Sequence, residues 1–385
     1  MKILVFSPYY PPHIGGLESH AEEFNKHFSK LTNSSITVFT PLLPTNSANK
    51  EKVNPNITII RYPAFEIIPN YPLPKFWSFQ FWRLFFNLYQ KSFNLVISRT
   101  RFFCSSFIAL IYAKAKGIKF IHIEHGSDFV RLNSRLKNLI AKIYDHTLGR
   151  MVLKFSDLNI SISTSVKNFI KKFDQRPSPI IRRGIDKKEI FLIPANRKLK
   201  EKYTDKIIIG FVGRLIDGKG VSDLITALSK IKKQNFICLI IGEGPQKKAL
   251  KKITAELNLE KKIIFLGQLR RKKTLSVMKT IDIFVNPSYS EGLPTAVLEA
   301  GLCQKAIIAT DVGGTKEIIQ NNKSGYLIKP KDISSLTKRL ENLIKKPELR
   351  KKFGRSAEKY IQKTFSWEKS IQKYEKEFAK IMAKK

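Results

Sequence analysis

The chain has 385 residues, of which 43% are hydrophobic, and this length and composition favour two globular domains with cores of ordinary size. Its 70 Lys and Arg residues outnumber its 31 Asp and Glu residues, so the formal net charge is +39. This excess predicts attraction to nucleic acid, anionic lipid or phosphorylated substrates, although much of it lies in segments of helical periodicity and also fits a solvated basic surface.

Several classes of protein are disfavoured at once. No basic block is interleaved with an aromatic RNA-reading signature, and no zinc-finger spacing occurs. The three cysteines, Cys104, Cys238 and Cys303, are too far apart for a C-x-x-C site or a disulfide framework. No apolar run reaches the ~18 to 20 residues needed to span a bilayer, and the start of the chain does not resemble a signal peptide. We expect a cytoplasmic protein, soluble or peripheral at the inner face of the cell membrane.

The chain opens with a strand, a glycine-containing loop and a helix. Residues 2–7 are predicted as a buried strand and residues 8–16 as the loop, after which apolar residues recur at helical spacing. Residues 41–56, rich in Pro, Asn and Ser, are predicted as an exposed loop between strands 36–39 and 57–61. The first series continues with strand 95–98, helix 105–116, strand 119–123, helix 134–155, strand 158–161, helix 165–172 and strand 179–182.

A second series of alternating elements follows the Lys-rich connection at residues 187–206. Its predicted elements are strand 207–212, helix 221–232, strand 236–241, helix 246–257, strand 263–266, helix 273–279, strand 281–285, strand 306–309, helix 315–319, strand 326–328 and three C-terminal helices. This alternation predicts an α/β protein with two Rossmann-like, doubly wound parallel-sheet domains facing a central cleft. We predict domains at 1–188 and 189–364, with a helix in 365–385 packing back on the first domain.

Residues 291–299 read E-G-L-P-T-A-V-L-E and follow the predicted strand at 281–285. A strand, a Gly-Pro turn and a helix bring Glu291, Glu299 and backbone N–H groups to the carboxyl end of a sheet, where open α/β sheets bind ligands. A sugar nucleotide would fit there. Alternatively, Glu291 merely favours the positive end of the helix dipole and Glu299 is a solvated helical residue.

Residues 211–220 read F-V-G-R-L-I-D-G-K-G and lead from a buried strand through a loop into a helix. Arg214 and Lys219 lie on this loop, beside the backbone donors of a helix N-terminus. Two cations there suit a diphosphate, and they could neutralise a leaving nucleoside diphosphate without a metal. In so basic a chain, the same pair could also arise by coincidence.

One histidine follows a strand of the first predicted domain. His125 comes directly after the strand ending at residue 123, so we expect it at the ligand-binding edge of the sheet, although a lone histidine can also be structural. His122 and His125 would point to different faces, and no Asp-x-Asp pair occurs, so we expect no metal site.

Two glycine-rich turns also follow predicted strands. Gly15 and Gly16 would let a ligand approach the backbone before a helix, and Gly242 ends a strand of the second domain. Each turn is weak evidence by itself and could be a plain tight turn.

Together these segments resemble the retaining GT-B glycosyltransferases of family four, which transfer sugars from nucleotide donors. The resemblance covers nearly the whole chain. It is carried by G-G-L-E-S-H at 15–20, H-G-S-D at 125–128, S-I-S-T-S at 161–165, G-R-L-I-D-G-K-G at 213–220, G-E-G-P at 242–245, F-L-G at 265–267, E-G-L-P-T-A-V-L-E at 291–299 and F-S-W at 365–367.

The resemblance implies roles for particular residues. Catalysis would involve His125, Arg214, Lys219 and Glu291. Donor binding would involve Gly16, Gly213, Arg214, Lys219, Gly242, Gly267, Glu291, Gly292, Leu293, Pro294, Thr295 and Glu299, with Glu299 on the ribose hydroxyls. Acceptor binding would involve Gly15, Gly16, His20, Arg99 and Asp128. It also implies retention of the anomeric configuration, with attack assisted by the donor phosphate, and electrostatic stabilisation of the leaving group as the largest contribution.

The chain departs from the family pattern at two places. Arg183-Gly184 stands where the family usually has Asn-Gly, and Ser98-Arg99 ends a strand that in the family usually ends in His-x-His. With Arg101 close by, these extra arginines suggest an anionic acceptor such as a phosphorylated lipid or sugar.

Residues 76–86, F-W-S-F-Q-F-W-R-L-F-F, are aromatic almost all round a predicted helix. Such a helix is expected to be buried. The alternative is insertion at a membrane interface, with Trp77 and Trp82 at headgroup depth and the basic surface drawn to anionic lipid.

The sequence therefore favours a metal-independent, retaining hexosyltransferase that needs no cofactor. The expected partners are a nucleoside-diphosphate sugar, a lipid-linked, phosphorylated or glycan acceptor and an anionic membrane surface, with no nucleic acid. Two alternatives stay open: a sugar-nucleotide epimerase or phosphorylase with the same two-domain fold, and a basic nucleic-acid-binding protein, for which steeply salt-dependent binding would be diagnostic.

Overall fold

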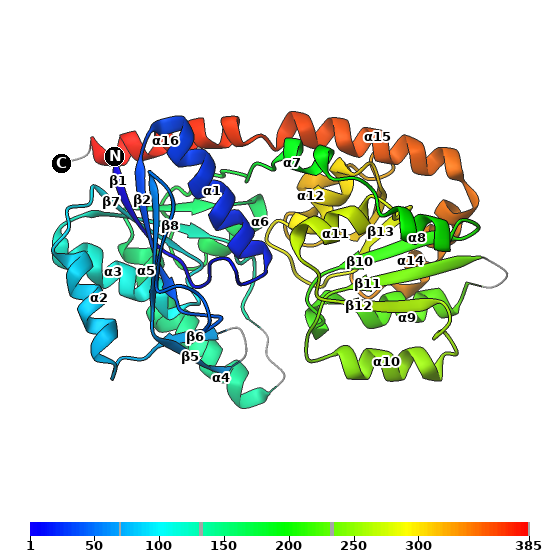
Figure 1. Cartoon of the computed structure of the whole chain (residues 1–385), viewed down its shortest axis with the longest axis horizontal. Coiled ribbons are helices and arrows are strands. Elements are labelled where there is room, and N and C mark those ends of the chain that lie inside the picture. The colour runs from blue at the N-terminus through cyan, green and yellow to red at the C-terminus, as the bar shows by residue number, and fades with distance from the viewer. Residues whose placement is uncertain (69–70, 131–133, 232–234, 384–385) are drawn as a thin grey trace. The chain divides into compact units, whose positions relative to one another are not determined.

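The computed structural model of the chain describes residues 1–68, 71–130, 134–231 and 235–383. It separates into two compact units (Figure 1). The first unit comprises Met1–Gly184 and Ser366–Lys385, and the second comprises Ile185–Phe365. Each unit has its own β-sheet and its own hydrophobic core.

A seven-stranded sheet forms the centre of the first unit, in the order β3-β4-β2-β1-β7-β8-β9. Its strands are β1 Lys2–Phe6, β2 Ser35–Pro41, β3 Lys50–Asn54, β4 Ile57–Tyr62, β7 Leu95–Arg99, β8 Lys119–Glu124 and β9 Leu158–Ser161. Neighbouring strands are parallel, except that the edge strand β3 runs antiparallel to β4. Successive residues Ile3, Leu4 and Val5 have no exposed surface. Both faces of β1 are therefore covered, as is usual for parallel sheets.

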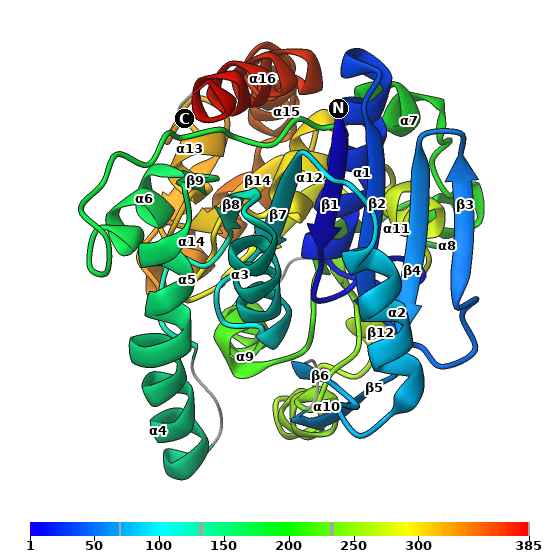
Figure 2. The same cartoon turned by 90° about the vertical axis from the view of Figure 1, so that its left-hand side faces the viewer.

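The first unit also contains a small antiparallel hairpin and several helices (Figure 2). These are hairpin strands β5 Ala64–Ile68 and β6 Tyr71–Pro74, and helices α1 Gly16–Thr32, α2 Phe79–Tyr89, α3 Cys104–Lys116, α4 Arg135–Tyr144, the π-helical turn η1 Asp145–Gly149, α5 Arg150–Phe155, α6 Thr164–Ile170 and α16 Trp367–Met382. The C-terminal helix α16 packs on α1, where the rings of Phe24 and Tyr374 lie 4.8 Å apart.

The second unit is built on a six-stranded parallel sheet in the order β12-β11-β10-β13-β14-β15. Its strands are β10 Ile207–Val212, β11 Phe236–Ile241, β12 Ile263–Gly267, β13 Ile283–Asn286, β14 Ala306–Thr310 and β15 Tyr326–Ile328. Its helices are α7 Lys187–Leu192, α8 Arg197–Lys202, the 3-10 turn η2 Asp217–Lys219, α9 Val221–Ser229, α10 Lys247–Glu256, α11 Arg271–Met278, α12 Thr295–Leu302, α13 Thr315–Ile318, α14 Ile333–Lys345 and α15 Pro347–Thr364.

Each sheet reverses its strand order at one place. In the first unit β1 lies between β2 and β7, and in the second unit β10 lies between β11 and β13. The chain therefore winds outwards in opposite directions from β1 and β7, and from β10 and β13. Open α/β sheets bind ligands at such switch points, next to the carboxyl ends of the strands. A ligand site is therefore expected on the loops that follow these four strands.

Three expectations about local structure were wrong. Residues 179–182 form only a single bridge, between Ser161 and Ile180, and not a strand. The predicted loop at 41–56 contains β3, whose polar residues hide its strand character because an edge strand in water needs no apolar face. The aromatic helix is also less buried than expected: α2 begins at Phe79, and Trp77 and Phe79 are 72% and 81% exposed.

Candidate active site

The strand ends of the second unit hold two loops in close contact. Gly213 donates its backbone N–H to the carbonyl of Ile241 at 3.0 Å, and Gly242 donates to the carbonyl of Gly267 at 2.8 Å. Gly242 has a φ of 141°, and a Cβ atom there would lie 1.9 Å from the carbonyl oxygen of Gly213. Only glycine fits this position, so the turn that the sequence marks keeps the loops after β10, β11 and β12 together.

An ion pair joins the two loops at the switch point of the second unit. Lys219, on η2 after β10, donates from Nζ to Oε1 of Glu291 at 2.7 Å. Glu291 lies between β13 and α12. The approach of the two loops requires Gly220, which has a φ of 61° and whose Cβ atom would lie 2.1 Å from the carbonyl oxygen of Pro287. The structure thus brings together two predicted catalytic residues that are 72 positions apart.

The second predicted carboxylate is held by a residue that the sequence analysis missed. Glu299 lies on α12 and is buried, and its Oε1 accepts a hydrogen bond from Nη1 of Arg271 at the start of α11. Arg271 also forms an ion pair with Glu189 at 3.3 Å. Because both carboxylates engage one guanidinium, Arg271 sets the direction in which the side chain of Glu299 points.

Other predicted donor residues of the second unit lie on these two loops or at the start of α12. Gly292, Leu293 and Pro294 lead into α12, which begins at Thr295. The first backbone N–H groups of a helix carry partial positive charge and lack partners within the helix. Arg214 lies between β10 and η2, and its side chain is exposed, with no hydrogen bond or ion pair to any other residue that the structure describes. Its guanidinium is therefore available to an anion.

The switch point of the first unit carries a buried cation between two histidines. Arg99, at the end of β7, has no exposed surface and donates from Nη1 to Nδ1 of His20 on α1 at 3.0 Å. The rings of His20 and His125 meet edge to face at 4.7 Å, and the Arg99 guanidinium lies 4.7 Å from the centre of the Phe24 ring. Nδ1 of His20 accepts a hydrogen bond, so that imidazole is neutral and carries its proton on Nε2.

Burial and the neighbouring cation keep both histidines neutral. Burial, with a smaller contribution from the charge of Arg99, lowers the pKa of His125 to about 3. The pKa of His20 is also lowered, first by burial and then by His125 and Arg99. Burial lowers the pKa of Arg99 itself to about 10, which leaves it charged at neutral pH. Nε2 of each histidine is buried without a hydrogen-bond partner among the described residues.

A second network holds the loop that follows β8. The Glu124 carboxylate accepts from the backbone N–H groups of His125 at 2.9 Å and Gly126 at 2.7 Å, and Arg101 lies 3.4 Å from it. Although burial opposes ionisation, Arg101 and these hydrogen bonds hold the pKa of Glu124 well below its usual range. His122 donates to or accepts from Ser98 at 2.7 Å and belongs to this network. No group of metal-ligating side chains occurs within the described ranges.

The extra arginines do not form an exposed anion site. Arg99, Arg101 and Arg183 are each at most 2% exposed. Arg101 is paired with Glu124 and Asp145, and Arg183 with Glu23 at 2.9 Å. All three guanidinium groups are therefore buried inside the first unit, and Nε and Nη2 of Arg99 have no hydrogen-bond partner among the described residues. An anionic acceptor stays a prediction.

The other predicted acceptor residues occupy two separate positions in the first unit. Gly16 is the first residue of α1, and Gly15 precedes it, one turn before His20. Asp128 lies on the loop after β8, where its carbonyl oxygen accepts from Arg101 at 3.4 Å and its carboxylate accepts from the N–H of Phe129. Thus His20, Arg99 and His125 form one cluster, while Asp128 belongs to the Arg101 network.

Two Rossmann-like units, each with polar residues at its switch point, define the chain as an α/β protein of the two-domain nucleotide-binding class. Comparison with known proteins identifies the family within this class. The model of the family "Glycosyltransferase Family 4" matches residues 14–189, and that of "Glycosyl transferases group 1" matches residues 193–360. The chain is 39% identical to an uncharacterized glycosyltransferase of Methanocaldococcus jannaschii, MJ1069, over 390 residues that cover 99% of each protein.

Solved structures agree with this assignment. Sucrose-phosphate synthase of Thermosynechococcus elongatus superposes with a TM-score of 0.82 at 18% identity, over 100% of both chains. Alr3699/HepE of Anabaena, solved in complex with UDP-glucose, superposes with a TM-score of 0.76 at 19% identity, over 99% of this chain and 100% of that one. The chain therefore belongs to glycosyltransferase family four, has the GT-B fold and is a glycosyltransferase.

Proposed function

We propose that the chain transfers a sugar from a nucleoside diphosphate to a glycan or lipid-linked acceptor, with retention of the anomeric configuration and without a metal. The observation that carries the proposal is the Lys219–Glu291 ion pair, which lies at the switch point of the second unit beside the start of α12. A donor diphosphate would accept hydrogen bonds from Lys219, Arg214 and backbone N–H groups at the start of α12. Each charge-assisted hydrogen bond contributes about 1.5 to 3 kcal/mol.

The two carboxylates of the second unit would orient the donor. Glu291 accepts from Lys219 and Glu299 from Arg271, so each already faces a cation, and neither is positioned as one of two carboxyl groups flanking a glycosidic bond. Glu299 would bind the ribose hydroxyls and Glu291 the sugar. Because no carboxylate serves as a nucleophile in this scheme, the chemistry depends on stabilising the departing diphosphate.

In the first unit, His125 would contact the sugar as a neutral imidazole. Its Nε2 lacks a partner among the described residues, so that atom can donate to or accept from a sugar hydroxyl. Its backbone N–H is fixed by Glu124, which keeps the residue in one position. Gly16 would leave room for the phosphate or the acceptor at the start of α1.

A ligand screen tests this function directly. UDP, GDP and ADP and their sugars are added to the whole chain, and one nucleotide should raise the melting temperature because it binds only the folded state. With an acceptor glycoside present, the matching nucleotide sugar should then transfer its sugar to an acceptor hydroxyl and release the nucleoside diphosphate in the presence of EDTA, and proton NMR of the new glycoside should show the anomeric configuration of the donor. If no nucleotide stabilises the protein, the assignment fails; an inverted product would refute retention alone.

We further propose that the first unit attaches to anionic membrane. Exposed apolar side chains occur on α2, at Trp82 and Phe86, and on α4 at the helical spacing of one stripe, at Leu136, Leu139, Ile140 and Ile143. The β5–β6 hairpin joins the two surfaces, since Phe65 contacts Trp77 at 5.0 Å and Tyr71 contacts Tyr144 at 6.2 Å. Figures 1 and 2 both show α2, the hairpin and α4 toward the same end of this unit.

Basic residues accompany these apolar surfaces, since Arg135, Lys137 and Lys142 lie on α4. Apolar insertion combined with basic residues is the pattern of peripheral attachment to anionic lipid. None of the helices in the described parts of the chain is long and apolar enough to cross a bilayer.

Vesicle flotation tests the attachment. The protein should float with vesicles containing anionic lipid and should be released by salt. Replacing Leu139 and Ile143 by Glu together should abolish flotation, whereas Met382→Glu, at an exposed apolar residue of α16, should not. Absence of flotation at low salt would refute the attachment.

A further inference from the structure

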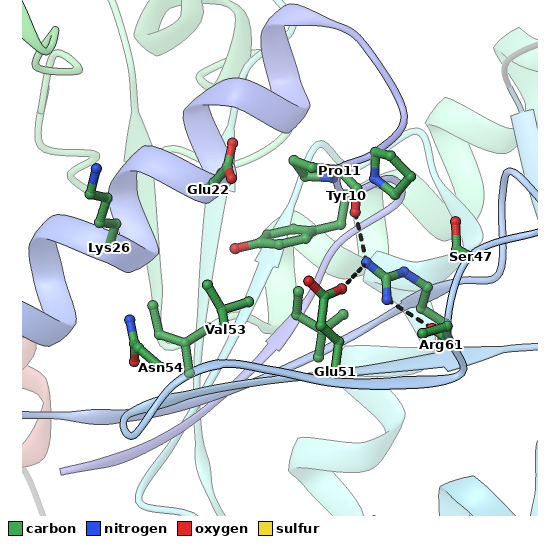
Figure 3. Close-up of a pocket in the computed structure, with 13 residues that line it drawn as sticks. Tyr10, Pro11, Glu22, Lys26, Ser47, Glu51, Val53, Asn54 and Arg61 are labelled. Carbon is green, nitrogen blue, oxygen red and sulfur yellow. Dashed lines mark hydrogen bonds and ion pairs between the residues drawn. The ribbon is translucent and has the colours of Figure 1, made fainter. Parts of the chain in front are cut away.

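A pocket of about 680 Å³ opens in the first unit between α1 and the β3–β4 hairpin. This volume lies within the range of roughly 300–1,000 Å³ that is typical of small-molecule sites. Its floor is apolar and buried, formed by Ile57 and Ile59 on β4 and by the ring of Tyr10, which Figure 3 shows between α1 and the hairpin. No role has been given above to any of these residues.

The polar rim of the pocket comes from both sides. Glu22 and Lys26 project from successive turns of α1, and Glu51 and Asn54 from the hairpin (Figure 3). Oγ of Ser47 is buried at the edge of the pocket without a hydrogen-bond partner among the described residues. A carboxylate accepts, an ammonium group donates, and amide and hydroxyl groups do both. The rim can therefore bind a ligand that carries several hydroxyl groups.

Arg61 holds the walls of the pocket in place. Its side chain is buried, and its guanidinium donates to the carbonyl of Pro11 at 2.7 Å, to the carbonyl of Ala48 at 2.8 Å and to the Glu51 carboxylate at 2.9 Å. One side chain thus ties the loop after β1, the loop before β3 and β3 itself together. A site whose walls are fixed in advance loses less free energy on binding.

The charge of the pocket distinguishes it from the rest of the chain. Its lining contains two carboxylates, Glu22 and Glu51, and two cations, Lys26 and Arg61, so its formal charge is 2 − 2 = 0, whereas the whole chain carries +39. The Arg61 cation is already paired with Glu51. Because the two carboxylates and the two cations cancel, the pocket offers a phosphate or carboxylate ligand no net attraction. A purely apolar ligand would remove water from the polar groups of the rim without giving them hydrogen-bond partners.

An uncharged sugar fits the pocket better than an anionic or a purely apolar ligand. Its hydroxyls both donate and accept, and the C–H face of its ring is apolar. The hydroxyls match the rim, and the C–H face matches Ile57, Ile59 and the ring of Tyr10. Burial raises the pKa of Tyr10 to about 12, so its phenol keeps its proton and can donate. Asn25 donates to the phenol oxygen of Tyr10 at 3.3 Å, and this hydrogen bond does not use the phenol proton.

We propose that this pocket binds an uncharged sugar residue of the acceptor, so that the acceptor is a glycan or lipid-linked sugar that carries a neutral unit. The inference rests on the proposed function, because it names the part of the acceptor that the first unit recognises. It differs from the anionic acceptor that the extra arginines suggest in the sequence.

Saturation-transfer NMR with the whole chain tests the proposal. The probes are the methyl glycosides of glucose, galactose, mannose and N-acetylglucosamine, together with the 6-phosphates of the three hexoses. We expect at least one neutral glycoside to bind and the phosphates to bind at least fivefold more weakly. Val53→Trp, which adds an indole at an exposed position of β3 in the pocket lining, should weaken binding at least tenfold. Ile67→Trp, at an exposed position of β5 outside the pocket, should not.

A second variant covers the case in which Val53→Trp does not fold. Glu22→Ala changes an exposed residue of α1, where alanine favours the helix, and should weaken glycoside binding at least threefold. Its matched control is Glu375→Ala on the exposed face of α16, which should leave binding unchanged. The proposal is overturned if no neutral glycoside binds, if the phosphates bind more tightly, or if both pocket variants bind like the unaltered chain.

The nucleotide screen separates the two possible failures. Val53→Trp and Glu22→Ala should keep the nucleotide-dependent rise in melting temperature. If nucleotides stabilise the protein and no neutral glycoside binds, only the sugar pocket is refuted. If no nucleotide binds while glycosides do, the proposed donor site is refuted and the pocket is a sugar site whose role in transfer is not supported.

Discussion

The two units place charge at their switch points in opposite ways. In the second unit, Lys219 and Glu291 are paired and only partly buried, with side-chain exposures of 22% and 11%, and Arg214 is exposed. In the first unit, Arg99 has no exposed surface and faces two neutral histidines and an aromatic ring. The charged side chains at the switch point of the second unit are therefore accessible to a ligand. The buried charge of Arg99 in the first unit instead influences the residues packed against it.

This difference suggests a division of labour. A partly exposed ion pair loses little when a diphosphate enters, because the cation exchanges one anionic partner for another. A buried cation among uncharged groups cannot exchange partners cheaply, since an unpaired buried charge is costly. We infer that the second unit changes its contacts when the donor binds, while the first unit keeps a fixed geometry around His125. Three sets of variants test this comparison.

The largest effect is expected at Lys219. Lys219→Ala removes a cation from the proposed diphosphate site and leaves Glu291 without this partner, so turnover should fall about 100-fold or more. Arg214→Ala should lower turnover by a similar factor. Steady-state kinetics with the nucleotide sugar found in the screen measures both. Lys351→Ala, which breaks an exposed ion pair on α15, is the control and should behave like the unaltered chain. Near-full turnover in Lys219→Ala would refute its role.

A smaller effect is expected at Arg271, which orients Glu299 without touching the donor. Arg271→Ala should raise KM for the nucleotide sugar about tenfold, with a smaller change in kcat, because ribose binding contributes before and during the reaction. Arg271→Lys should recover part of the loss, since it restores a cation but not the geometry of two carboxylates on one guanidinium. A change in kcat alone would contradict this positioning role.

The sequence predicted the framework of both sites. Alternating apolar strands and helices predicted two parallel sheets, and the placement of Lys219 and Glu291 on loops after strands predicted that both lie at one sheet edge, where the structure pairs them. The contact between His20 and His125 was not predicted. Gly242 is also explained by the structure, because no other residue fits its contact with the neighbouring loop. These features follow from local pattern and from the geometry of parallel sheets.

Other features were not predictable from local pattern. Arg271 is one of several basic residues in a row, and nothing local marks it as the partner of Glu299, 28 positions later. The burial of Arg99 was not predictable either, because the sequence does not show whether the end of a strand is covered by a helix. The pocket beside α1 depends on β3, a polar edge strand that lacks the alternation by which strands are recognised.

The smallest effect is the pH dependence of stability that comes from the first unit. It tests whether His20 and His125 stay neutral in the folded chain. His20 and His125 have lower pKa values in the folded state than the ordinary value of 6.5, so below that pH the unfolded chain binds more protons than the folded one. The free energy of unfolding should therefore be highest above about pH 7 and fall on acidification from about pH 6.5. The loss is at most about 1.4 kcal/mol per pH unit for each histidine.

Arg99→Met tests the source of this pH dependence. The variant removes a charge that lowers both histidine pKa values and leaves burial, the largest cause, in place. Urea unfolding between pH 7.5 and 5 measures this fall in the unaltered chain, and Glu124, whose pKa is also lowered, contributes a loss only below about pH 4.5, outside this window. In Arg99→Met the imidazole NMR signals of His20 and His125 should titrate at higher pH than in the unaltered chain, whereas Lys30→Met, at an exposed residue of α1, should leave them unchanged. Unchanged titration of the two imidazoles in Arg99→Met would mean that the cation has little influence on the histidines, and burial alone would keep the cluster neutral.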